Sequence, residues 1–147
     1  MKLLITKFFT LVLLGFAGGS YGQDFEETKL LAEQGDLNAQ LDLGTLYSRG
    51  LGIPENDAEG VEWFWRAAKQ GSRFAFYELG VHYGNGRGVV FDSVKAYAYF
   101  SIAATLDTGG SGSAESARVL MVRRLSPEGL ILGQNLATKC FESDYQD

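Results

Sequence analysis

Histidine and cysteine are almost absent from this sequence of 147 residues, which has one of each and only two prolines. Zinc and similar transition metals are usually held by several His and Cys ligands, so a site of that kind is excluded. A single cysteine also excludes a framework of internal disulfides. We expect Cys140 to be a small buried residue near the C-terminus, with an intermolecular disulfide as the lesser alternative.

An excess of positive charge is missing as well. The formal net charge is -5, whereas a nucleic-acid-binding protein needs a basic face. The hydrophobic content of 46% and the aromatic content of 13% are high enough to form a core, so the chain is not intrinsically disordered. The composition predicts one folded, acidic domain.

The first 22 residues have the layout of a secretory signal peptide. Lys2 and Lys7 accompany an apolar run over residues 8–17, and small residues follow it. The run is too short to span a membrane, which takes about 20 apolar residues. We therefore predict a signal peptide over residues 1–22 and an exported domain over residues 23–147, periplasmic or secreted. A retained N-terminal anchor and a cut three residues earlier are the alternatives. Cleavage removes two lysines and no acidic residue, so the net charge becomes -7.

The sequence matches itself when it is shifted by 36 residues. The matched pairs are Gly35/Gly71, Ala39/Ala75, Leu43/Leu79, Gly44/Gly80, Tyr47/Tyr83, Gly50/Gly86 and Gly52/Gly88. Many matches in one register at such a period are typical of a solenoid. We predict two repeat units, over residues 35–70 and 71–106.

Each unit is predicted to contain two helices. Apolar residues recur at helical spacing over residues 37–47, and again over 57–69 and 93–105. Asn56 and Asp92 precede the second helix of each unit, where their side chains can accept hydrogen bonds from the first free N–H groups. A glycine inside a helix costs about 1 kcal/mol relative to alanine. Its recurrence in the first helix of both units therefore indicates a close approach between helices. The predicted fold is all-α.

These residues carry a resemblance to a known family. The pattern Ala-x3-Leu-Gly-x2-Tyr-x2-Gly-x-Gly occurs at residues 39–52 and 75–88. It is similar to the Sel-one-like repeat (SLR) family, whose members are relatives of tetratricopeptide repeats with a longer Gly-rich loop. The resemblance implies a short right-handed α-solenoid of helix-turn-helix repeats. Lys95-Ala96 fits the family pattern in the second unit, whereas Glu59-Gly60 replaces it in the first.

The ends of the domain are predicted to cap the repeats, because two repeats alone are too few to bury a continuous core. Residues 23–34 form an N-terminal cap and residues 113–141 form C-terminal capping helices. Ser126 and Pro127 together are a strong helix start. Residues 107–113 contain three glycines and are expected to form a flexible loop.

No catalytic constellation is found in the sequence. The Gly-rich stretch over residues 84–88 resembles a phosphate-binding loop, but it follows a helix and repeats the loop of the first unit. His82 has no nucleophile or carboxylate partner in the pattern and is interpreted as a packing residue. We therefore expect a protein that is not an enzyme and that has no cofactor and no metal.

A surface for a partner protein is predicted on the first helix of each unit. In a solenoid this helix commonly lines the concave face, where partners bind. The candidate binding residues are Phe74, Tyr77, Glu78, Val81, Leu41 and Asp42. Aromatic anchors beside an acidic rim are typical of an interaction hot spot. The competing interpretation is that these residues are buried against the helix expected over residues 114–125.

The sequence therefore suggests an exported adaptor or regulator that binds another protein, such as an antagonist or immunity protein of a secreted or periplasmic enzyme. The acidity favours a basic partner. We expect no nucleic acid as partner and no membrane span after signal cleavage. The alternative is a protein that binds or hydrolyses β-lactams or binds a cell-wall ligand. The resemblance links β-lactam chemistry to cysteine-rich SLR proteins, and this chain lacks their cysteines and any Ser-x-x-Lys motif.

Overall fold

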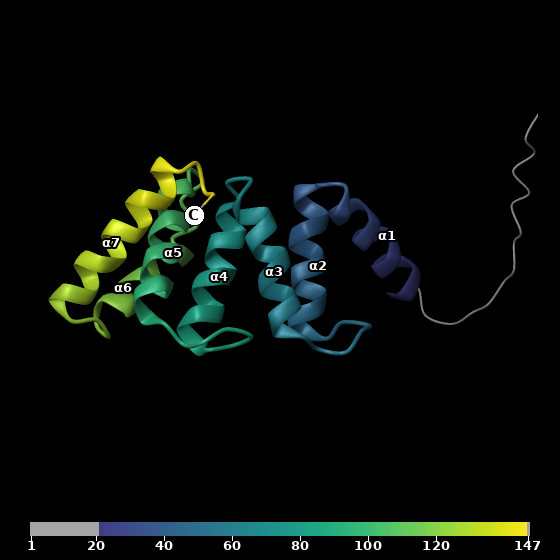
Figure 1. The fold of residues 1–147 in the computed structure, drawn as a ribbon, viewed down its shortest axis with the longest axis horizontal. Helices are drawn as coiled ribbons and strands as arrows, with labels where there is room; N and C mark the ends of the chain where they lie inside the picture. The colour runs from purple at the N-terminus through teal and green to yellow at the C-terminus, as the bar shows by residue number, and fades with distance from the viewer. Residues whose placement is uncertain (1–20, 147) are drawn as a thin grey trace, which may run out of the picture.

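The computed structural model describes residues 21–146, and within this range the chain forms helices and no strand (Figure 1). The helices are α1 (Tyr21–Glu33), α2 (Leu37–Arg49), α3 (Asp57–Ala68), α4 (Arg73–Asn85), α5 (Ser93–Leu106), α6 (Ser113–Val122) and α7 (Pro127–Glu142). The predicted all-α fold is confirmed. The predicted signal peptide, residues 1–22, lies almost wholly outside the described residues and stays a prediction, as do the domain boundaries.

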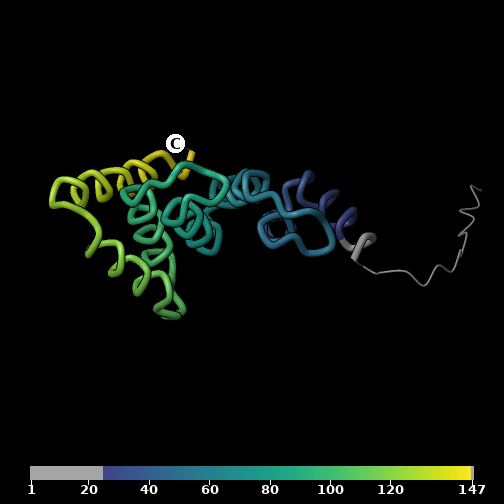
Figure 2. The backbone as a smooth tube through the Cα atoms, turned by 90° about the horizontal axis from the view of Figure 1, so that it is seen from below, coloured from purple at the N-terminus to yellow at the C-terminus, as the bar shows by residue number. Residues whose placement is uncertain are grey.

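The helices pack in chain order into a short row. Helices α2 and α3 form one antiparallel pair, α4 and α5 form the next, and α1 packs against α2 (Figure 1). Both α6 and α7 pack against α5, and Figure 2 shows them diverging from each other at this end of the row. The solenoid is therefore completed by one helix before the repeats and two helices after them.

Side chains cap the first turns of most helices, as the sequence predicts. Asn56 accepts a hydrogen bond from the backbone N–H of Glu59, and Asp92 accepts from two N–H groups at the start of α5. Ser126 accepts from the N–H of Gly129, directly before the proline that begins α7. These bonds satisfy N–H groups that have no partner inside a helix, so they fix where each helix begins.

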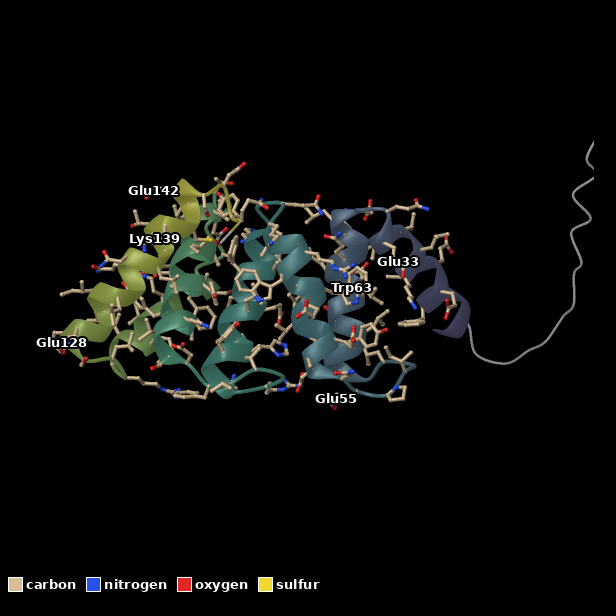
Figure 3. The ribbon with its side chains drawn as sticks, viewed as in Figure 1. Glu33, Glu55, Trp63, Glu128, Lys139 and Glu142 are labelled. Atoms are coloured by element: carbon tan, nitrogen blue, oxygen red, sulfur yellow. The ribbon has the colours of Figure 1, made fainter. Side chains whose placement is uncertain are left out.

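The core is built from aromatic and small residues of the repeats. Phe64, Phe76 and Leu79 are fully buried, and Cys140 is buried beside them as expected. Trp63 belongs to a smaller cluster at the N-terminal end. Figure 3 shows this tryptophan inside the row of helices, whereas Glu55, Glu128 and Glu142 lie at its edges. The apolar stripes read from the sequence therefore face the interior.

The recurring helical glycines bring helices together, as predicted. A Cβ atom on Gly44 would lie 2.7 Å from Cε1 of Phe64, and one on Gly80 would lie 2.7 Å from Cε1 of Phe100. Both phenylalanines are buried, so the same glycine–phenylalanine contact joins α2 to α3 and α4 to α5. This contact leaves no room for a side chain at either glycine.

The C-terminal tail folds back onto the second repeat. The ring of Tyr145 lies 5.4 Å from that of Phe76 and 5.6 Å from that of Phe141, measured between centroids. Asp144 and Tyr145 adopt left-handed backbone conformations with φ of 53° and 65°. Such conformations are unfavourable for residues other than glycine. The aromatic contacts and a hydrogen bond from the N–H of Tyr145 to the carbonyl of Cys140 offset that cost.

Candidate functional site

The features that resemble catalytic or phosphate-binding elements have structural roles. His82 is 2% exposed, and its Nδ1 atom lies 2.9 Å from the carbonyl oxygen of Arg87 in the following loop. Arg87 in turn donates hydrogen bonds to Asp57 and to the carbonyl of Ser48 in the first repeat. The Gly-rich loop over residues 84–88 therefore joins the two repeats. Within residues 21–146 no group of His, Cys, Asp or Glu side chains is arranged to hold a metal ion.

The six predicted partner-binding residues do not all line one cavity. Three of them, Phe74, Tyr77 and Glu78, line a common cavity, and Phe74 is 57% exposed. Val81 does not line this cavity, because it packs against a cluster that includes Met121 of α6. That half-buried position agrees with the competing interpretation for this residue.

The two candidate residues of the first repeat lie on α2 and do not line the cavity. Leu41 is half-buried and packs against the central core. Asp42 is exposed and occupies the position equivalent to Glu78, 36 residues earlier. The structure thus places three of the candidate residues, those of the first two turns of α4, around one cavity.

The cavity has a volume of about 280 Å³ and lies between α4, the end of α5 and the start of α6. Its floor consists of two buried alanines, Ala103 and Ala114. Phe74 and Tyr77 form an aromatic wall, and the Tyr77 ring is held from behind by Phe100 at 5.5 Å between centroids. The arrangement is a small depression with an apolar floor, beside an exposed aromatic side chain.

A hydrogen-bonded clamp closes one side of the cavity. Arg73 donates from Nη1 to Oδ1 of Asp107 over 2.7 Å, and the hydroxyl of Ser111 donates to Oδ2 of Asp107 over 2.6 Å. The guanidinium of Arg73 also stacks on the ring of Phe74, 4.2 Å from its centroid. The loop over residues 107–113, expected to be flexible, is thus tied to α4. Sequence reasoning missed the clamp because this loop has no counterpart in the first repeat.

One charged side chain at the cavity remains without a counter-ion. Within the described residues Glu78 forms no ion pair, whereas Arg73 is paired with Asp107. Glu78 is half-buried on α4, one position after Tyr77. The cavity therefore carries one uncompensated negative charge.

The clamp lowers the pKa of Asp107 below its ordinary value of 3.8, through the hydrogen bond from Ser111 first and the positive charge of Arg73 second. A carboxyl with a lowered pKa in the folded state stabilises it at neutral pH, and this contribution is lost as the pH falls through that pKa. The contribution of the clamp is therefore complete above the ordinary pKa of 3.8, and we expect the clamp to open only below that pH, as the pH falls through the lowered pKa. Arg73→Gln and Ser111→Ala should each raise the pKa of Asp107, measured by NMR titration of its carboxyl carbon. Arg66→Gln is the control, because Arg66 stacks on Trp63. A pKa that stays unchanged in both clamp variants would contradict the clamp.

A second cavity, of about 450 Å³, opens between α5, α6 and α7. Its polar groups bond mainly to one another: Arg118 donates two hydrogen bonds to Glu115 and one to the hydroxyl of Tyr97. Burial opposes ionisation of Tyr97, but hydrogen bonds with Gln134, Arg118 and Ser101 outweigh it and lower the pKa. The cavity is open and its charges are already paired, so the residues around Phe74 are the stronger candidate site.

The repeated helix pairs, the recurring glycine–phenylalanine contact and the capping helices define a helical-repeat solenoid. The family model for the Sel1 repeat matches residues 37–72 and 75–107. The chain therefore carries two Sel1 repeats and is a Sel1-repeat protein, as its resemblance predicted. Sel1-repeat proteins are in general non-catalytic modules for protein interaction. No helix among the described residues has the length and apolar character needed to cross a membrane.

Solved structures similar to this chain include the following two proteins. A protective antigen of uropathogenic Escherichia coli strains, which displays an SLR fold, is 26% identical with a TM-score of 0.79, over 88% of this chain and 28% of that chain. A Sel1 repeat protein from Oxalobacter formigenes is 26% identical with a TM-score of 0.64, over 81% of this chain and 50% of that chain. This chain thus spans half or less of the length of either protein. The comparison with curated proteins gives no match.

Proposed function

We propose that this protein is an interaction module that binds another protein through the cavity beside Phe74. The observation that carries the proposal is the exposed Phe74 side chain at a cavity with an apolar floor. Large exposed aromatics beside a pocket are typical of the anchors that dominate binding energy. The cavity is part of a helical-repeat scaffold, and the helices of this scaffold hold its aromatic wall in place.

We further propose that the module acts after export, as an adaptor, regulator or antagonist of a secreted or periplasmic enzyme. The signal-peptide pattern of residues 1–22 supports export, and the net charge of -5 supports a basic partner through complementary fields. The alternative role, binding of a β-lactam or a cell-wall ligand, would need convergent polar groups in a closed pocket.

Affinity capture with three baits tests the proposed site. The domain from residue 23 onward is used as the wild type, as Phe74→Ala and as Phe91→Ala, after circular dichroism has shown that all three fold. Phe91 is the matched control, because this residue is 56% exposed, like Phe74, but lies in the loop before α5. We expect a stoichiometric partner that Phe91→Ala retains and Phe74→Ala loses, since removal of a hot-spot aromatic costs about 2 kcal/mol or more.

Other outcomes have defined meanings. A partner retained by both variants would place the binding surface elsewhere on the solenoid. A partner lost by both would indicate nonspecific capture through exposed aromatics. Absence of any partner, together with binding of a β-lactam or cell-wall fragment by the same domain, would favour the alternative role.

A further inference from the structure

We propose that the cavity beside Phe74 receives a positively charged side chain, Arg or Lys, presented by the partner protein. The inference rests on the proposed function and specifies the chemistry of the partner at this site. It follows from three properties of the cavity: its hydrogen-bonding groups, its aromatic wall and its net charge.

Among the polar side chains at the cavity, the guanidinium of Arg73 is paired with Asp107, whereas Glu78 and Ser111 can accept hydrogen bonds from a ligand. Glu78 contributes a carboxylate that has no counter-ion within the described residues. The hydroxyl of Ser111 donates its hydrogen to Asp107 and accepts a hydrogen bond from Nη1 of Arg73 over 3.5 Å, so it can offer a ligand only its remaining lone pair. A ligand that donates several hydrogen bonds therefore fits this rim, and the guanidinium and ammonium groups are such donors.

The aromatic wall suits the same ligand. A cation over an aromatic ring is attracted to the negative face of that ring. Phe74 already binds the guanidinium of Arg73 in this way, and the residue remains 57% exposed. Ala103 and Ala114 offer an apolar floor for the alkyl stem that carries the charge of an Arg or Lys side chain.

The charge at the cavity excludes the other classes of side chain. An anionic side chain would meet the uncompensated carboxylate of Glu78. A purely apolar side chain would bury that half-buried carboxylate further without a partner, which is costly. A cation pairs with Glu78 and removes this penalty, because Arg73 is already neutralised by Asp107.

Short blocked peptides test the inference without the natural partner. The probes are acetyl-Ala-Ala-Arg-Ala-Ala-amide and the same peptide with citrulline, which has the shape of arginine but no charge. Each is titrated into the 15N-labelled domain, and the amide shifts of Phe74, Tyr77 and Ala103 are followed. We expect both peptides to bind weakly and the arginine peptide to bind about five-fold more tightly, a difference of about 1 kcal/mol.

A pair of variants assigns this preference to one carboxylate. Glu78→Gln should abolish the preference for arginine while Asp42→Asn, the equivalent position of the first repeat, should keep it. Equal affinity for the two peptides, shifts confined to other helices, or a preference that survives Glu78→Gln would each overturn the inference. If capture of the partner depends on Phe74 while the peptides are not distinguished, the proposed function stands and this inference fails.

Discussion

Gly88→Ala is expected to lower the free energy of unfolding by about 3 kcal/mol, the largest effect we predict for a single methyl group. Gly88 has a φ of +69°, a left-handed conformation that costs an alanine about 1–2 kcal/mol. The loop that contains Gly88 also packs closely against the first repeat. A Cβ atom at Gly88 would lie 2.6 Å from the backbone nitrogen of Ala58. Backbone atoms cannot rotate away, so the two repeats would have to separate. Urea unfolding followed by circular dichroism measures the loss.

Gly110→Ala separates the two causes of this effect. Gly110 has nearly the same φ, +68°, but a Cβ atom there would have no neighbour within 4 Å. In Gly110→Ala the free energy of unfolding should therefore fall only by the cost of the left-handed backbone conformation, about 1–2 kcal/mol. Equal losses in the two variants would show that the contact between the loop and the first repeat contributes nothing.

The repeat architecture could be predicted from the sequence because each of its elements is encoded locally and twice. Asn56 and Asp92 cap their helices in the structure as their positions suggested, and α2 and α5 end within two residues of the expected boundaries. The glycines at positions 44 and 80 do mark close helix contacts. A local signal that recurs at a fixed period is read reliably, because the two copies confirm each other.

The candidate site could be predicted only in part. The 36-residue register placed Phe74, Tyr77 and Glu78 on one face of a helix, which needs only helical geometry. The clamp that shapes the cavity joins Arg73 to Asp107, 34 residues away. That contact depends on the path of the glycine-rich loop over residues 107–113. This loop occurs only once in the sequence, so the 36-residue period could not predict the contact. The C-terminal tail, which places Tyr145 against Phe76, also occurs only once, so its position could not be predicted from the repeat period either.

The cavity depends on the geometry of the solenoid as well as on its own residues. Tyr77, one wall of the cavity, packs on Phe100, and Phe100 occupies the space that the absent side chain of Gly80 leaves on α4. The glycine that recurs for packing therefore also sets the position of the aromatic wall. A change at this glycine should alter stability and the cavity together.

Gly80→Ala is accordingly expected to destabilise the domain by up to about 2 kcal/mol, although alanine favours a helix more than glycine does. The gain in helix propensity is about 1 kcal/mol, and overpacking of a core costs about 1–3 kcal/mol. The new Cβ atom would lie 2.7 Å from Cε1 and 2.8 Å from Cδ1 of Phe100, whose ring is buried and held by Tyr77. The steric clash with Phe100 should outweigh the gain in helix propensity. Chemical unfolding measures the resulting change in the free energy of unfolding.

Gly84→Ala on the same helix should have the opposite sign. Gly84 is also buried, but its new Cβ atom would lie 3.4 Å from Cβ of Ala96 and 3.9 Å from Sδ of Met121, which are ordinary contacts. The first repeat has a serine at the equivalent position, Ser48, so a Cβ atom is accommodated there. We expect Gly84→Ala to stabilise the domain by about 0.5–1 kcal/mol. If Gly80→Ala and Gly84→Ala both stabilised the domain, the packing between α4 and α5 would be able to adjust to an added methyl group. In that case the ring of Phe100 would yield to the methyl group.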